Sequence, residues 1–71
     1  MSGLEITVNG DPFKLRAGAT VADVVALIVD DAEPKGIAVA LDRCVVPRSL
    51  WRDTVVQGGS QVEVVTAAAG G

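Results

Sequence analysis

The sequence predicts an α+β fold, a mixed sheet of about five strands with one main helix packed on one face. Short segments alternate between apolar and polar residues at a period of two, which is typical of half-buried strands. One segment instead repeats its apolar residues at helical spacing. The chain has only 71 residues, so it holds one small domain. A single helix laid across a single sheet is then the economical way to bury both apolar faces.

The first two strands are predicted to form a hairpin. Residues 4–9 alternate between apolar and polar side chains. Asn9-Gly10 then favours a tight turn, because both residues tolerate positive φ. Residues 13–16 alternate again, and Pro12 is tolerated at the edge of a sheet, where a missing donor is not needed. The side chains expected on the buried face are Leu4, Ile6, Val8, Phe13 and Leu15.

The segment from Thr20 to about Asp31 is predicted to be the helix. Its many β-branched residues favour a strand by propensity alone, but its apolar positions follow the i, i+3, i+4, i+7 pattern of a helix. Thr20 and Asp23 resemble a capping box with the shorter acid, and an acid there also suits the positive end of the helix. Residues 32–36 contain the proline and glycine that end it. The expected apolar stripe is Val21, Val24, Val25 and Ile28.

The rest of the domain is predicted to supply three more strands and one helical turn. Two of these strands alternate at a period of two, and a proline stops the third. The resulting order, β-β-α-β-β-β over residues 1–66, is that of the β-grasp or ubiquitin-like architecture. The segments are a strand at 37–41, a turn at Asp42-Arg43, a strand at 44–46, a helical turn at 49–54, a loop at 57–60 and a last strand at 61–66.

Composition argues against several classes of function. Six Lys and Arg against nine Asp and Glu give a net charge of −3, which disfavours a nucleic-acid partner. The longest apolar run, residues 24–29, is too short to span a bilayer, so no membrane partner is expected. Histidine is absent and Cys44 is the one cysteine, so the commonest general base, metal ligand and redox pair are missing. We therefore expect no catalytic residue, no metal site and no cofactor bound by this chain.

Cysteine usage also bears on location. A secreted domain this small would normally need several disulfides, and no basic and apolar leader precedes the first strand. The expected location is therefore the cytoplasm. A lone cysteine in a short apolar strand most often serves packing, so we expect Cys44 to be a packing residue.

Residues 67–71 are predicted to form a flexible C-terminal tail. Three alanines cannot nucleate a helix and offer no bulky side chain to dock. Gly70 and Gly71 lack Cβ atoms and can thread a narrow channel in another protein. The Gly71 carboxylate is ionised at neutral pH and is a poor electrophile until ATP and an activating enzyme convert it to a mixed anhydride. The alternative is a frayed terminus without a role.

Six short segments of the chain carry a family resemblance by their order and spacing. The most specific is residues 46–51, Val-Pro-Arg-Ser-Leu-Trp. The others are residues 6–10, 20–23, 37–41, 62–65 and the closing Gly70-Gly71. These segments are distributed along the whole chain. The arrangement resembles the ThiS family, the sulfur carrier proteins of thiamine thiazole biosynthesis.

The resemblance implies a sulfur-transfer cycle. In that family an activating enzyme uses ATP and Mg²⁺ to adenylate the terminal glycine carboxylate. Sulfur from cysteine, delivered by a desulfurase as a persulfide, displaces AMP to give a thiocarboxylate, and thiazole synthase takes this sulfur. On this chain the modified residue would be Gly71, with Gly70 as the neck behind it. The chain would be a carrier and not an enzyme, and its partners would be the activating enzyme, thiazole synthase and, indirectly, a cysteine desulfurase.

The residues also suggest where partners make contact. The sheet face away from the helix carries Ala38, Ala40 and Val65, which is unusually apolar for a solvent face. We expect the activating enzyme and thiazole synthase to dock there. Arg48 either orients its turn or contacts a partner. Trp51 is expected to close one end of a core that is short of aromatic residues.

The sequence departs from the family pattern at two places. Two functions other than a thiamine sulfur carrier also stay open. Gly58-Gly59-Ser60 stands where the family usually carries acidic residues around a glycine, and three alanines precede the final glycines in place of larger residues. The small subunit of molybdopterin synthase is another β-grasp carrier ending in Gly-Gly, although residues 47–49 favour the thiamine type. The third interpretation is a ubiquitin-like protein modifier, or a plain binding module.

Overall fold

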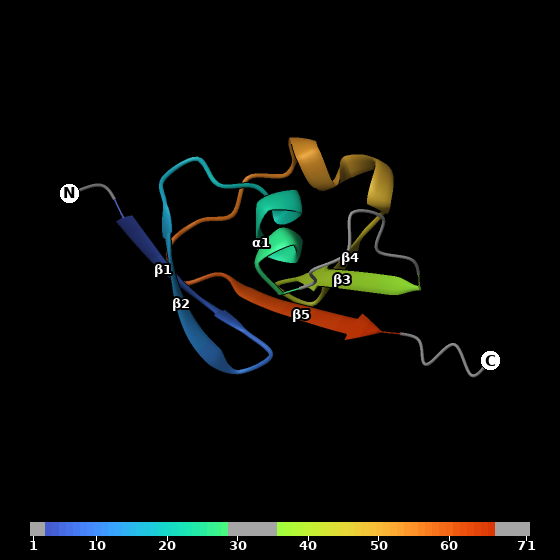
Figure 1. Cartoon of the computed structure of the whole chain (residues 1–71), viewed down its shortest axis with the longest axis horizontal. Coiled ribbons are helices and arrows are strands. Elements are labelled where there is room, and N and C mark those ends of the chain that lie inside the picture. The colour runs from blue at the N-terminus through green and yellow to red at the C-terminus, as the bar shows by residue number, and fades with distance from the viewer. Residues whose placement is uncertain (1–2, 29–35, 67–71) are drawn as a thin grey trace.

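The computed structural model describes residues 3–28 and 36–66 of the chain, and the element order matches the predicted β-β-α-β-β-β (Figure 1). The predicted domain boundary at residue 66 stays a prediction, because the tail at residues 67–71 lies outside the described residues. The elements are β1 Gly3–Val8, β2 Asp11–Arg16, α1 Val21–Ile28, β3 Ile37–Leu41, β4 Cys44–Val46, the 3₁₀ helix η1 Arg48–Asp53 and β5 Gln61–Thr66.

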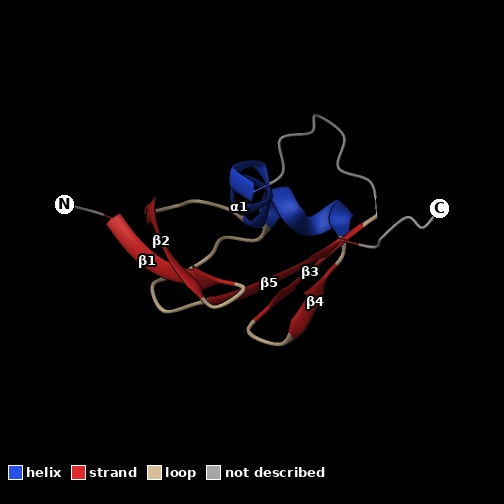
Figure 2. Ribbon diagram, turned by 60° about the horizontal axis from the view of Figure 1, so that its bottom comes forward, coloured by secondary structure: helices blue, strands red, loops and turns tan. Residues whose placement is uncertain are grey.

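The five strands form one mixed sheet in the order β2-β1-β5-β3-β4. The central pair, β1 and β5, is parallel, and the other three pairs are antiparallel. Both α1 and η1 lie on the same side of this sheet (Figure 2). The fold is therefore the predicted β-grasp, with one face of the sheet covered and the other left open by the residues that the structure describes.

Two hairpins connect neighbouring strands, and both use two-residue turns. Asn9 and Gly10 have φ values of 53° and 89°, as a type I′ turn requires. The turn between β3 and β4 repeats this geometry without a glycine, since Asp42 has φ 50° and Arg43 has φ 72°. The Asp42 N–H donates to the Gln61 carbonyl (2.8 Å), and the Gln61 N–H donates to Asp42 Oδ1 (2.9 Å). These bonds hold a turn whose backbone conformation is costly for non-glycine residues.

The start of α1 confirms the predicted capping box. The Thr20 N–H donates to Asp23 Oδ2 (2.9 Å), and the Asp23 N–H donates to Thr20 Oγ1 (3.3 Å), so two otherwise unpaired donors at the helix start are satisfied. The predicted stripe was wrong at Ile28, which is 38% exposed. The buried positions all fall in the first five residues of α1, so its last described turn extends past the surface that it covers. The predicted continuation to Asp31 lies outside the described residues.

The core is aliphatic and is closed at one end by a single aromatic residue. Trp51 on η1 is 6% exposed, and its indole Nε1 donates to the Val46 carbonyl (2.9 Å), which satisfies the polar atom of a buried ring. The role expected of Trp51 is thus confirmed. The buried apolar residues are Ile6, Val8, Ala19, Val21, Val24, Val25, Val39, Val46, Trp51, Val56, Val62 and Val64.

Two features between residues 44 and 54 differ from the predictions made from the sequence. Cys44 is exposed, so the packing role expected for it was wrong: it begins a three-residue strand at the edge of the sheet, where no further strand among the described residues covers it. The helical turn expected at residues 49–54 is a 3₁₀ helix that begins at Arg48. No helix in the described part of the chain is long and apolar enough to cross a membrane.

Candidate functional site

The candidate site is the end of β5 and the surface around it. Gly70 and Gly71 lie outside the described residues, so the structure describes the strand that leads to them. β5 lies inside the sheet between β1 and β3. Its last residues pair with the first residues of β3, with Thr66 opposite Ile37 and Val65 opposite Ala38. The root of the predicted tail is therefore anchored on one side by a regular antiparallel ladder.

On its other side, β5 is held by the side chain of Asn9. The parallel pairing with β1 ends at Val8 and Val62, and the Asn9 N–H adds a bond to the Val62 carbonyl (2.9 Å). The Asn9 carboxamide then bonds both backbone groups of Val64: Oδ1 accepts from the Val64 N–H (2.9 Å) and Nδ2 donates to the Val64 carbonyl (3.2 Å). A side chain thus extends the ladder by one step, to within two residues of the end of β5.

This role of Asn9 was not predicted from the sequence. The residue was explained by its place in the turn, where Asp or Gly would serve as well. Among these residues, asparagine alone offers a donor and an acceptor on one short side chain, as an amide ladder needs. The choice of asparagine is the one feature of the sequence that could have indicated this role. It could not be interpreted from the sequence, because the partner of Asn9 lies 55 positions away in the chain.

The open face of the sheet brings together the three residues predicted to contact partners. Ala38 lies opposite Val65, and Ala40 lies between Val45 and Glu63 on the two neighbouring strands. Val65 is 61% exposed and Val45 74% exposed, whereas their sequence neighbours Val64 and Val46 are buried on the helix side. We call the group Ala38, Ala40, Val45 and Val65 the outer patch.

Val45 was not predicted to lie on this face, because a strand of three residues gives too little alternation to show which of its sides is buried. Because Val65 is the penultimate residue of β5, the outer patch reaches the root of the predicted tail. A partner bound to this patch would be beside the chain as it leaves the sheet. The predicted docking role of Ala38, Ala40 and Val65 stays a prediction.

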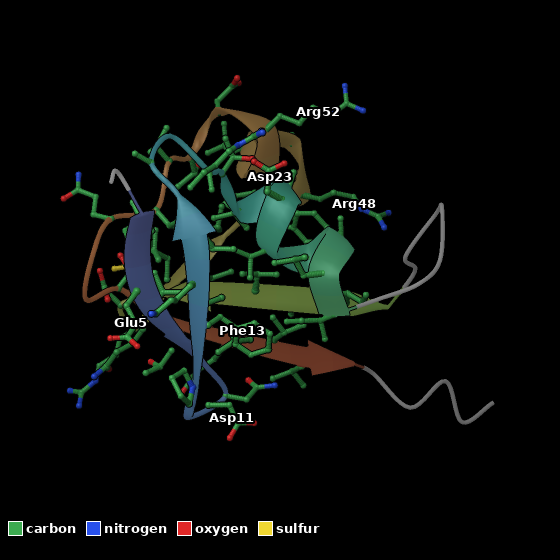
Figure 3. The ribbon with its side chains drawn as sticks, turned by 60° about the vertical axis from the view of Figure 1, so that its left-hand side comes forward. Glu5, Asp11, Phe13, Asp23, Arg48 and Arg52 are labelled. Carbon is green, nitrogen blue, oxygen red and sulfur yellow. The ribbon has the colours of Figure 1, made fainter. Side chains whose placement is uncertain are left out.

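Arg48 lies apart from the outer patch. It is exposed on η1, on the side of the sheet that carries α1 (Figures 2 and 3), and its guanidinium carbon lies 5.4 Å from the centre of the Trp51 ring. This is a cation–π contact. The contact supports the first of the two roles considered for Arg48, orientation of its own turn.

The departure at Gly58-Gly59-Ser60 is accommodated by the fold. Gly59 has φ 89° and donates its N–H to the Glu5 carbonyl (2.8 Å). Ser60 is buried, and its hydroxyl accepts a bond from the Gln57 N–H (3.0 Å). The turn is thus stabilised by one local bond and one backbone bond to β1, and neither needs an acidic side chain.

Within residues 3–28 and 36–66, no group of three or more His, Cys, Asp or Glu side chains could hold a metal ion. A shallow groove of about 280 Å³ lies between β2 and α1. It is on the opposite edge of the sheet from β4, and its lining is mainly apolar. The described residues thus present an exposed apolar patch and a strand leading to Gly70 and Gly71.

A five-stranded β-grasp domain whose last strand leads to a Gly-Gly sequence defines the class of small ubiquitin-like carrier proteins. Residues 6–71 match the model of the ThiS family. Over 68 residues the chain is 31% identical to the sulfur carrier protein ThiS of Escherichia coli (strain K12), covering 96% of this chain and all of that protein. This chain belongs to the ThiS family, as the sequence resemblance indicated.

A solved structure supports the same assignment. The chain is similar to the crystal structure of the thiamine biosynthesis protein ThiS from Geobacter metallireducens, with a TM-score of 0.77 and 26% sequence identity. The similarity covers 96% of this chain and all of that chain. The agreement extends over the whole domain and is not limited to a shared hairpin or helix.

Proposed function

We propose that this chain carries sulfur for thiazole formation in thiamine biosynthesis, as a thiocarboxylate on Gly71. The observation that supports this most directly is the family match, which runs through to Gly71. The similar E. coli protein is named a sulfur carrier and is covered over its full length. A carrier needs a stable domain, a docking surface and a reacting terminus, and it does not need catalytic side chains of its own.

The chemistry follows from the weak reactivity of a carboxylate. An activating enzyme directs the Gly71 carboxylate onto the α-phosphorus of ATP, and pyrophosphate leaves, so the carboxyl carbon becomes an electrophile bonded to a good leaving group. The terminal sulfur of a persulfide, formed from cysteine by a desulfurase, attacks this carbon and AMP leaves. A thiol then reduces the S–S bond, and Gly71 keeps one sulfur as a thiocarboxylate. ATP and Mg²⁺ belong to the activating enzyme.

Gly70 and Gly71 suit this chemistry because a chain without Cβ atoms can enter a narrow active site. In the proposed cycle the outer patch docks on the activating enzyme and later on thiazole synthase. Its two alanines allow close approach to the sheet, and Val45 and Val65 supply exposed apolar surface. The bonds from Asn9 and from β3 hold the end of β5, so a docked partner meets the tail at a defined point. No observation favours a molybdopterin-type carrier or a protein modifier beyond the shared fold.

Mass spectrometry of the intact protein tests the proposal. The protein is incubated with ATP, Mg²⁺, a ThiS-activating enzyme, a cysteine desulfurase and cysteine. The expected result is a mass gain equal to exchange of one oxygen for sulfur, and a chain lacking Gly71 should show none. No gain with several active activating enzymes contradicts the proposal. Rescue of a thiazole-requiring strain, and not of a molybdopterin-deficient one, separates the thiamine pathway from its closest alternative.

Replacement of Ala40 by glutamate tests the docking role of the outer patch. The charge would lie at the centre of the patch, between Val45 and Glu63, and would have to be desolvated in the complex. We expect binding to the activating enzyme to weaken about tenfold or more, a cost of about 1.4 kcal/mol or more. Arg52→Glu, on η1, serves as a control for a charge change elsewhere. Unchanged binding by Ala40→Glu would remove the outer patch from the proposal.

A further inference from the structure

The direction of the backbone groups in β2 follows from bonds made by its neighbour. On β1, the Thr7 N–H donates to the carbonyl of residue 60 (3.0 Å), and the Glu5 carbonyl accepts from the N–H of residue 59 (2.8 Å). These backbone groups therefore face β5 and the loop before it. Their antiparallel partners on β2 are Pro12 and Lys14. Because hydrogen-bonded and non-hydrogen-bonded pairs alternate, Pro12 and Lys14 must direct their own backbone groups away from β1.

The outer edge of β2 is consequently a row of open backbone groups. By the same alternation, the backbone N–H and carbonyl of Arg16 also face away from β1. The Arg16 carbonyl accepts a bond from the Ala19 N–H (3.2 Å). The groups left are the carbonyl of Pro12, the N–H and carbonyl of Lys14, and the N–H of Arg16. In the described part of the chain no strand pairs with this edge. An extended segment of another chain could pair with all four groups.

The groove beside this edge accepts apolar side chains. Four of its six lining residues are apolar: Leu15 on β2, Ala19 between the two elements, and Ala26 and Leu27 on α1. Arg16 and Asp23 complete the lining. Leu27 is 58% exposed. Figure 3 shows β2 in front with α1 beside it. A strand added to β2 would direct every second side chain to the helix side of the sheet, over this groove.

The remaining side chains of such a strand would lie nearest to two cations, with Glu5 of β1 on the inner side of Lys14. Phe13 and Leu15 are partly buried against the core, so alternation along β2 directs the exposed Lys14 to the opposite face. Arg16 is also exposed, and it lines the groove at the end of β2. Acidic side chains on the added strand would lie beside these two cations. A second copy of β2 would instead place Lys14 and Arg16 against the same two charges, so the edge is protected from pairing with itself.

We propose that the open edge of β2 and the adjoining groove form a second docking surface, which takes an extended segment of a partner protein as an added strand. In this segment aliphatic residues alternate with Asp or Glu. Backbone bonds to β2 hold the strand, the aliphatic side chains fill the groove, and the acidic side chains pair with Lys14 and Arg16. The outer patch lies on β5, β3 and β4, and β1 separates it from β2, so the two surfaces do not share a strand.

Peptide titration of the isotope-labelled full chain, followed by NMR, tests the proposal. Three capped heptapeptides are compared: alternating glutamate and valine, alternating lysine and valine, and the glutamate peptide N-methylated at the amides that would pair with β2. We expect the glutamate peptide to shift the amides of Lys14 and Arg16 and the methyls of Leu27 saturably. It should bind about tenfold tighter than the lysine peptide, and N-methylation should abolish binding.

Variants of the full chain assign the binding to named residues. Lys14→Glu combined with Arg16→Glu should reverse the preference between the two charged peptides. The neutral pair Lys14→Gln and Arg16→Gln should remove that preference, which keeps the test decisive if charge reversal impairs folding. Leu27→Ser should weaken binding of the glutamate peptide, and Arg52→Glu, an exposed cation on η1, should leave it unchanged.

Four results would overturn the proposal. They are equal affinity for the acidic and basic peptides, shifts centred on Val45 and Val65 of the outer patch, no saturable shift up to the solubility limit, and shifts of β2 amides that depend on protein concentration without peptide. The last would show that a second copy of the chain occupies the edge.

Discussion

The two hairpin turns of this protein have the same backbone geometry and hold opposite ends of the same strand. Asn9 begins one turn and bonds both backbone groups of Val64 through its side chain. Asp42 begins the other turn and bonds both backbone groups of Gln61, one through its side chain and one through its own N–H. β5 is thus held near its C-terminal end by one turn and at its N-terminal end by the other.

The difference lies in which end each turn holds. Gln61 begins β5 at an exposed position, whereas Val64 is buried and lies two residues before the end of the strand. The left-handed conformation of the first turn residue is needed at both sites, and Asn and Asp are among the few residues that adopt it readily. The comparison shows that a turn residue can be selected for its reach to a distant strand as well as for its φ.

The largest effect is expected from Asn9→Ala. The substitution removes two side-chain bonds, leaves the partly buried backbone groups of Val64 without these partners and places alanine at φ 53°. These losses should lower the free energy of unfolding by about 2–4 kcal/mol, as measured by denaturant titration. A change below ~1 kcal/mol would mean that water replaces the carboxamide without loss.

Asn9→Gly separates the side-chain bonds from the turn. Glycine adopts the required φ, so the expected loss falls to about 1–2 kcal/mol. Hydrogen exchange of the Val64 amide should become faster relative to that of Gln61. If Asn9 also positions the tail, thiocarboxylate formation should slow under conditions where the variant is folded. An unchanged rate would limit Asn9 to a structural role.

Asp42→Ala is expected to have the second largest effect, about 1–2 kcal/mol, from the lost bond to Gln61 and from alanine at φ 50°. Exchange should become faster at Gln61 and not at Val64, the reverse of the result for Asn9→Gly. Asp42→Asn keeps the acceptor oxygen and the tolerance of positive φ, and it should stay within about 0.5 kcal/mol of the parent chain. Equal exchange at both ends of β5 in both variants would show that the strand loosens as one unit.

The local parts of this fold could be predicted from the sequence, because each depends on residues close together in the chain. The period-two strands, the Asn9-Gly10 turn and the Thr20–Asp23 capping box are of this kind. The bond from Asn9 to Val64 could not be predicted, since it depends on the parallel pairing of β1 with β5. The exposure of Ile28 and Cys44 depends on how far neighbouring elements extend, which is also a tertiary property.

For the candidate site, alternation was sufficient to place Ala38, Ala40 and Val65 on one face. It did not show that Val45 joins them, because the short strand at residues 44–46 gives too little pattern to fix which face is buried. The open edge of β2 was implied by Pro12, but its direction became clear from the bonds of β1. Gly70 and Gly71 were identified by chemistry and by family, and they lie outside the described residues.

The smallest expected effect concerns the second residue of each turn, where the two turns differ in residue type. Gly10 has φ 89°, and Arg43 has φ 72° without being glycine. Arg43→Gly should remove about 1–2 kcal/mol of left-handed strain from the folded state. It should also stabilise the unfolded state by about 0.4–1 kcal/mol, because glycine raises the conformational entropy of the unfolded chain. The net result should be a gain of about 0.5 kcal/mol in the free energy of unfolding.

Gly10→Ala is the matched change in the opposite direction. A Cβ at this position meets nothing within 4 Å, so only the backbone strain and the chain-entropy term operate, and a loss of about 0.5 kcal/mol is expected. Thermal or denaturant unfolding of both variants at one pH checks the pair. Equal and opposite changes would show that the two turns are energetically equivalent at this residue. A lower free energy of unfolding for Arg43→Gly would instead show that the arginine side chain stabilises its turn by more than its positive φ costs. The two turns would then be equivalent only at their first residues, Asn9 and Asp42.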